Sequence, residues 1–186
     1  FSKLNPDVFA VKDISKLLTA AEKIIIHTNE NSGADYAGNT DVNKLLQYDI
    51  DVFLKFDPGN FRGPILKTAK FGVWSYYFSD KNLFRGGPAG FWEFYYQKKE
   101  IGSSLEIVNE YGTGPVLYKS WSAISRIHKK TMDSFYLKTS LFIERKLKEL
   151  YESGEESFLM KQKQENVQRN AYSGKTYSVP GNFQFL

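Results

Sequence analysis

The segment most informative about the fold runs from Phe71 to Glu93 and reads FGVWSYYFSDKNLFRGGPAGFWE. Its first part, 71–78, is a run of apolar and aromatic residues that indicates a strand inside a sheet. A glycine-rich loop follows over 79–90, and 91–98 is expected to form a helix. Open α/β sheets bind ligands where a strand end, a glycine-rich loop and a helix start meet. Alone, such a loop is also typical of a simple turn.

Strands and helices are predicted to alternate on both sides of this stretch. The other predicted strands are 23–28, 50–56, 103–108 and 116–118. The other predicted helices are a short one after Asp13, one that opens at Thr40 or Asp41, and 65–70, 121–131 and 134–152. This alternation favours parallel strands with helical crossovers. The predicted fold class is therefore α/β, a Rossmann-like, mostly parallel sheet with helices on both faces.

The predicted α/β domain spans residues 1–152. Its last helix places four leucines on one face, as packing on a sheet requires: Leu137, Leu141, Leu147 and Leu150. From 153 to 186 this periodicity ends, and Gly, Ser, Asn and Gln become frequent. We interpret 153–186 as a linker, or as an arm that packs on another part of the protein.

The composition limits the chemistry that the chain can perform. Among its 186 residues there is no Cys, which excludes disulfides, thiolate metal sites and cysteine nucleophiles. The two histidines, His27 and His128, are too few and too far apart in sequence to indicate a zinc centre, so no metal is expected. No apolar run reaches the roughly 18 residues of a membrane span, and no signal peptide is visible. We therefore expect a cytoplasmic protein.

The net charge is +4 at pH 7, and the basic residues concentrate in 119–163. We interpret this segment as solvated helix faces, because Glu144 and Lys148 form a favourable i,i+4 pair. The alternative is a binder of nucleic acid or of an anionic surface that uses a set of basic residues, namely Lys129, Lys130, Arg145, Lys146 and Lys148. No nucleic-acid motif accompanies them, so a nucleic-acid partner is not expected.

The order of residues in 71–93 resembles the folate-dependent formyltransferases. The resemblance is greatest to a bacterial subgroup that reads GVWSFHHGD and then RGGPxGFWE, which Gly72–Ser75, Asp80 and Arg85–Glu93 match. It extends over roughly residues 5 to 150 and implies a partial formyltransferase fold. It also implies that 10-formyltetrahydrofolate, if it binds, contacts a loop formed by Arg85, Gly86, Gly87 and Pro88.

The residues that this family uses for catalysis differ here. The resemblance places the family's His on Tyr77, its Asn on Ser75 and its Asp on Gly112. A phenol is a poor base near pH 7, and a positioned base typically supplies about 10² to 10⁴ in rate. If the chain is active, the catalytic residues would be Tyr77, Ser75 and Asp80, and Glu93 is a second carboxylate that could act as base.

Two functional hypotheses follow from the resemblance. In the first, the chain is a formyltransferase-like pseudoenzyme that binds a ligand or partner, or that serves as a structural module of a larger protein. Such domains in the resembled subgroup often occur in proteins of surface-polysaccharide synthesis. In the alternative, the chain is an active N-formyltransferase that moves a formyl group from 10-formyltetrahydrofolate to an amino sugar. The family usually has a further half ahead of the start of this chain, so we expect either a truncated chain or a domain that has lost part of its acceptor site. Another domain of the same protein is an expected partner, because the segment from Ser153 would lead to it or pack on it.

Overall fold

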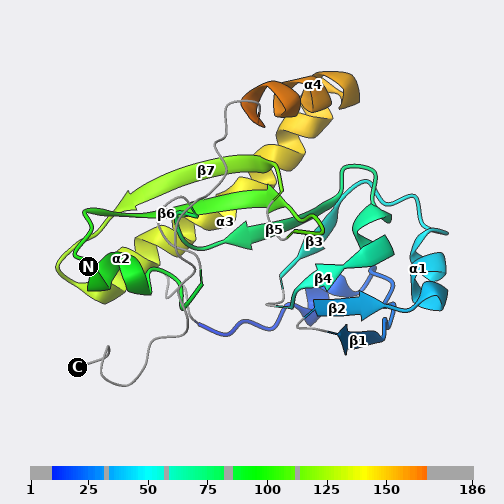
Figure 1. The fold of residues 1–186 in the computed structure, drawn as a ribbon, viewed down its shortest axis with the longest axis horizontal. Helices are drawn as coiled ribbons and strands as arrows, with labels where there is room; N and C mark the ends of the chain where they lie inside the picture. Colours follow the sequence, from blue (N-terminus) through cyan, green and yellow to red (C-terminus); the bar gives the residue numbers. More distant parts are fainter. Residues whose placement is uncertain (1–9, 32–33, 57–58, 82–85, 112–113, 167–186) are drawn as a thin grey trace.

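The computed structural model describes residues 10–31, 34–56, 59–81, 86–111 and 114–166, and these form two sheets (Figure 1). A three-stranded sheet has the order β1-β2-β4, with β1 at Thr28–Asn31, β2 at Ala34–Ala37 and β4 at Phe61–Arg62. A four-stranded sheet has the order β3-β5-β6-β7. Its strands are β3 (Phe53–Lys55), β5 (Val73–Tyr77), β6 (Glu100–Ile107) and β7 (Val116–Ala123).

The helices lie around these sheets. The α-helices are α1 (Asn39–Leu45), α2 (Phe91–Tyr95), α3 (His128–Ser153) and α4 (Glu155–Asn166). Two 3₁₀ helices are η1 (Ser15–Leu18) and η2 (Gly63–Lys67). The long helix α3 runs along one face of the four-stranded sheet, and α2 lies near the end toward which β5 points (Figure 1). The prediction of an α/β protein is confirmed.

The orientation of the strands differs from the mostly parallel sheet that we expected. The pairs β2–β4 and β3–β5 are parallel, whereas β1–β2, β5–β6 and β6–β7 are antiparallel. The sheets are therefore mixed. One reason is that only residues 108–115 join β6 to β7, and a parallel crossover needs a dozen residues or more.

The main core lies between the four-stranded sheet and the last two helices. Trp74 of β5, Phe142 of α3 and Phe158 of α4 are almost completely buried in one cluster. Phe158 stacks on Trp74 with ring centroids 6.0 Å apart and meets Phe71 edge-on at 5.9 Å. Part of the segment predicted as a linker or arm is thus a helix that belongs to the core. The rest of that segment, 167–186, lies outside the described residues.

The predicted leucine face of the last helix is wrong at three of its four positions. Leu137, Leu141 and Leu147 are each about two-fifths exposed, and only Leu150 of the four packs against the core. The buried side of α3 is instead formed by Thr131, Met132, Phe135, Thr139, Phe142 and Lys146. The two phenylalanines fill more core volume than leucines do, and Thr139 reaches the sheet by a 2.8 Å hydrogen bond with Ser103.

Two predicted elements are also placed differently. The run 23–28 was expected to be a strand, but β1 begins only at Thr28, and it pairs with β2 at Ala34–Ala37. Ile24 and Ile26 pack against the core under the smaller sheet, while Ile25 is 62 % exposed. The alternation of a strand is therefore present without a partner strand. At 121–131 a helix was expected, but 121–123 pair with β6 as the end of β7, so α3 begins at His128.

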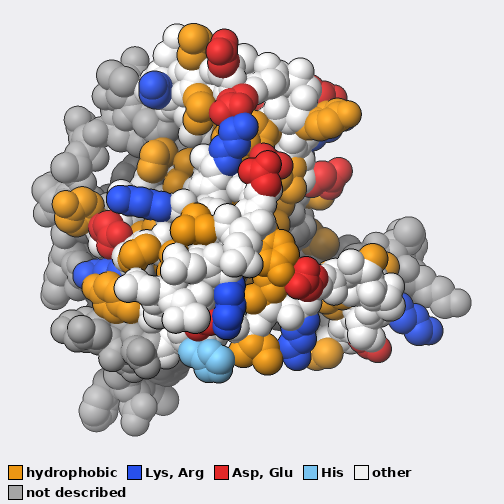
Figure 2. Space-filling model, turned by 90° about the vertical axis from the view of Figure 1, so that its right-hand side faces the viewer, with side chains coloured by type: hydrophobic (Ala, Val, Ile, Leu, Met, Phe, Trp, Pro, Cys, Tyr) orange, Lys and Arg blue, Asp and Glu red, His pale blue; other side chains and the backbone are white. Residues whose placement is uncertain are grey.

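The surface supports the interpretation of the charges as solvated. On the face that Figure 2 presents, basic and acidic side chains are interspersed with hydrophobic ones. Along α3, Lys129 pairs with Asp133 at 3.0 Å and Lys148 with Glu152 at 3.8 Å, and both lysines are exposed, whereas Lys146 is buried. In the described part of the chain, no helix combines the length and the apolar character needed to cross a membrane.

Candidate functional site

Strand β5 divides its side chains between the two faces of the four-stranded sheet, because alternate residues of a strand point in opposite directions. Trp74 and Tyr76 point toward α3 and the core, and Ser75 and Tyr77 point to the opposite face. On β6, Glu106 is the partner of Ser75 and Ser104 the partner of Tyr77, and on β7 Lys119 is the partner of Ser104. We call this second face the polar face; it includes Ser75, Tyr77, Ser104, Glu106 and Lys119, together with Lys55 of β3, the partner of Ser75.

Asp80, a predicted catalytic residue, is anchored to this face. It follows β5 in a segment that folds back across β6, and only 6 % of its surface is exposed. One carboxylate oxygen accepts a hydrogen bond from Lys119 Nζ at 2.7 Å, and the other accepts one from Trp121 Nε1 at 3.1 Å. Gly102 allows this approach, since a Cβ there would lie 2.9 Å from Asp80 Cβ. Asp80 therefore links the segment after β5 to β7.

Glu106 forms a second ion pair on the polar face. Lys81 Nζ lies 2.5 Å from one carboxylate oxygen of Glu106, and Ser104 Oγ donates to the other at 2.6 Å. The same ammonium group lies 4.2 Å from the centroid of the Tyr77 ring, a cation–π distance. Glu106 is 5 % exposed, so these partners take the place of water around its carboxylate. The lysine also holds the Tyr77 ring in place.

Glu93 is the third carboxylate near the predicted site and the most deeply buried, at 1 % exposure. It lies in the first turn of α2, where a negative charge is favoured. Its Oε1 accepts hydrogen bonds from Ser79 Oγ at 2.7 Å and from the Asp80 backbone N–H at 3.3 Å. Glu93 thus fixes the start of the segment that carries Asp80, which is a positioning role.

The predicted cofactor loop meets the polar face at one point. The backbone N–H of Gly86 donates to Tyr77 Oη at 3.4 Å, which brings the loop to the predicted catalytic position. Gly86, Gly87 and Pro88 are exposed, while Arg85 lies outside the described residues. Gly87 has a φ of 83°, and a Cβ there would lie 2.5 Å from Trp92 Nε1. Close packing on Trp92 therefore accounts for one of the glycines that we assigned to ligand approach.

The two histidines contact neighbouring elements: His27 precedes β1 and lies beside the first turn of α1, and His128 begins α3. The His27 side chain is 81 % exposed, and its Nδ1 is 3.5 Å from an oxygen of Asp41 in the first turn of α1. The His27 backbone N–H and Lys44 both donate to Asp41, and they hold the pKa of that carboxyl below its ordinary value. His128 is the first residue of α3 and packs on the Phe94 ring at 4.5 Å. Both contacts stabilise local structure.

The structure brings Ser75, Tyr77 and Asp80 into one region, and it adds three residues that the sequence did not single out. These are Lys81, Glu106 and Lys119. The available signal was polar alternation, since Ser104 and Glu106 alternate with the apolar residues Leu105 and Ile107. Gly112, the position of the family's Asp, lies outside the described residues. Among those described, no three His, Asp or Glu side chains cluster as a metal site requires.

The polar face carries hydroxyl groups and two ion pairs, Lys119–Asp80 and Lys81–Glu106, each of which joins one positive and one negative group. Trp121, at 43 % exposure, presents a ring beside them. Comparison with models of known protein families finds no match to this chain, and a search of curated proteins also finds none. The formyltransferase resemblance therefore rests on the sequence pattern, most specifically on 71–93, and stays a prediction.

Proposed function

We propose that this chain is a formyltransferase-like domain that has lost formyl transfer and binds a ligand or partner at its polar face. Formyl transfer breaks the bond from the formyl carbon to the folate nitrogen and forms one to an amine, which must lose a proton. That proton needs a base, and the developing oxyanion needs a hydrogen-bond donor.

The observation that carries the proposal is that each carboxylate suited to replace the missing base already has a structural role. Asp80 is engaged by Lys119 and Trp121, and Glu93 by Ser79 and the Asp80 backbone. To accept a proton, either group would have to give up part of a buried hydrogen-bond network, which is costly at low dielectric. These contacts support a binding role over a catalytic one.

The ligands in this proposal are those that the resemblance implies, a folate or an amino sugar. The hydrogen bond from Gly86 to Tyr77 supports a common site, because it joins the loop expected to contact folate with the position expected to contact the formyl group. The proposal further places the domain in the cytoplasm, beside another domain of the same protein, in surface-polysaccharide synthesis. The competing function is active N-formyl transfer to an amino sugar, with Tyr77 and Ser75 as hydrogen-bond donors.

The test measures binding and turnover separately. Titration calorimetry with 10-formyltetrahydrofolate and tetrahydrofolate is carried out on the chain, on Tyr77→His and on Tyr77→Phe, which retains the ring and removes the hydroxyl. We expect micromolar binding by the unaltered chain, weaker binding by Tyr77→Phe, and no release of tetrahydrofolate in the presence of amino sugars.

Two results would count against the proposal in different ways. Steady release of tetrahydrofolate with an amino sugar, lost in Tyr77→Phe, would establish the enzyme instead. No binding at millimolar ligand, either by the chain or by Tyr77→His, would remove folate as the ligand and leave partner binding.

A further inference from the structure

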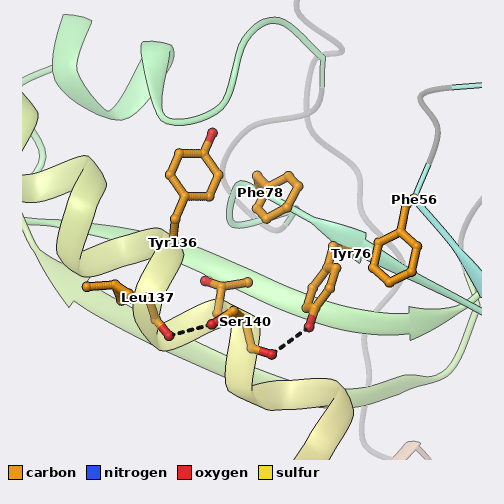
Figure 3. Close-up of a pocket in the computed structure, with 7 residues that line it drawn as sticks. Phe56, Tyr76, Phe78, Tyr136, Leu137 and Ser140 are labelled. Atoms are coloured by element: carbon orange, nitrogen blue, oxygen red, sulfur yellow. Dashed lines mark hydrogen bonds between the residues drawn. The ribbon is translucent and has the colours of Figure 1, made fainter. Parts of the chain in front are cut away.

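An aromatic groove lies on the side of β5 opposite to the polar face (Figure 3). Its volume is about 470 Å³, within the range of small-molecule sites, roughly 300 to 1,000 Å³. The lining residues come from β3 and β5, or the residues after them, and from one side of α3: Phe56, Tyr76, Phe78, Tyr136, Leu137, Thr139 and Ser140. We call it the aromatic groove. The proposed function does not use it.

The walls of the aromatic groove are fixed by contacts between rings. Tyr76 and Phe78 stack with centroids 5.7 Å apart and planes 19° from parallel, and Phe78 meets Tyr136 edge-on at 5.3 Å. Tyr76 Oη donates to the Ser140 carbonyl at 3.1 Å, which connects β5 to α3 across the floor (Figure 3). In a preformed site of this kind, few side chains lose conformational freedom when a ligand binds. More of the interaction energy is therefore available as affinity.

The lining also restricts the chemistry of the ligand. None of the seven lining residues carries a charged side chain. The hydroxyls of Ser140 and Thr139 donate back into α3, to Leu137 O at 2.8 Å and to Phe135 O at 2.7 Å. Burial raises the pKa of Tyr76 and of Tyr136, so both phenols stay neutral at physiological pH. An ion or a sugar would lose hydration here without replacement, whereas an uncharged ring would gain stacking and edge contacts.

We propose that the aromatic groove binds a flat, uncharged aromatic molecule against the Tyr76–Phe78 stack. Phe56 forms the outer wall, with its centroid 6.4 Å from that of Tyr76. It is 72 % exposed, so a docked ring covers apolar surface that now faces water. Leu137, at 41 % exposure, covers the opposite rim from α3.

The probe for this test is 1-N-phenylnaphthylamine, an uncharged aromatic dye whose fluorescence rises in an apolar site. We expect saturable binding to the unaltered chain with a micromolar Kd. Phe56→Ala and Leu137→Ala should each weaken binding about five- to tenfold, since each removes one wall. Leu141→Ala is the matched control, because Leu141 is equally exposed on the same helix and does not line the groove. Its Kd should equal that of the unaltered chain.

Both wall residues are partly exposed, so their variants are expected to fold, and far-UV circular dichroism verifies this. The anionic dye 8-anilinonaphthalene-1-sulfonate is titrated in parallel and should bind at least tenfold more weakly than the uncharged dye. The proposal is overturned by absence of saturable binding below millimolar dye, by equal losses in Leu137→Ala and Leu141→Ala, or by preference for the anionic dye. It is also overturned if size-exclusion chromatography shows a dimer that Phe56→Ala dissociates, because a second copy would then occupy the groove.

Discussion

On the α3 side of the four-stranded sheet, Trp74 and Tyr76 of β5 pack among aromatic rings, while on the other side Ser75 and Tyr77 of the same strand lie beside ion pairs. The aromatic side is stabilised by removal of apolar area from water. Its close packing is sensitive to changes in side-chain shape, but it does not depend on charged partners. The polar side depends on matched partners, so removal of one partner is worse than removal of both. The two faces of β5 are therefore stabilised by different interactions, and mutations can distinguish the contribution of each face.

The largest effect is expected on the aromatic side. Phe142 is fully buried and contacts Tyr76 and Tyr118, so Phe142→Ala should lower the free energy of unfolding by about 3–5 kcal/mol. The preceding residue, Leu141, is 41 % exposed, and Leu141→Ala should change it by about 0.5 kcal/mol. Urea unfolding followed by circular dichroism measures both. Similar losses in the two variants would mean that α3 packs with a different face.

An intermediate effect with a distinctive pattern is expected on the polar side. Glu106→Leu leaves the Lys81 ammonium without its carboxylate in a site where the lysine side chain is only 17 % exposed. We expect a loss of about 2–3 kcal/mol in the free energy of unfolding. The double variant Lys81→Met/Glu106→Leu should regain most of this loss. If the double variant instead loses the sum of what Glu106→Leu and Lys81→Met lose separately, the two residues of the ion pair are not coupled.

The smallest effect concerns the contact between α3 and α4. Burial disfavours ionisation of Glu149, but hydrogen bonds from Lys146 and Lys161 outweigh it and hold the pKa of Glu149 below its ordinary value. A lowered pKa in the folded state adds stability above the unfolded pKa, and this is lost as pH falls through the folded pKa. Between pH 6 and pH 3 the unaltered chain should lose up to about 1 kcal/mol more than Glu149→Gln. Glu152→Gln, at a more exposed position of the same helix, is the matched control in the same urea series.

The elements that could be predicted from the sequence are those with a local signal. The strand at 71–78 contains β5, and the helix opening at Thr40 or Asp41 overlaps α1, because each carries its own apolar pattern. The predicted leucine face was wrong at three positions because a periodicity analysis treats leucine and phenylalanine as equally apolar. The buried side of α3 is formed by Phe135 and Phe142. Helix α4 was missed because one buried residue, Phe158, attaches it to the core.

The candidate site was predictable only in part, for a related reason. Ser75, Tyr77 and Asp80 are near one another in sequence, so proximity alone brings them together. Lys119 and Glu106 reach them through the register of β5, β6 and β7, which no local pattern specifies. The aromatic groove is still less visible from the sequence, because its lining comes from separate segments that meet only when α3 lies on the sheet.

The position of Phe158 has a consequence for how the protein is made. Phe71 and Trp74 are synthesised well before α4, yet the Phe158 ring of α4 packs against both. The growing chain therefore carries an unfilled aromatic slot until Phe158 has been synthesised, although strands β3 to β7 are complete by Ala123. Exposed apolar surface of this kind is what makes partly folded chains aggregate. Helix α4 thus sets the moment in translation at which the nascent domain can close its core.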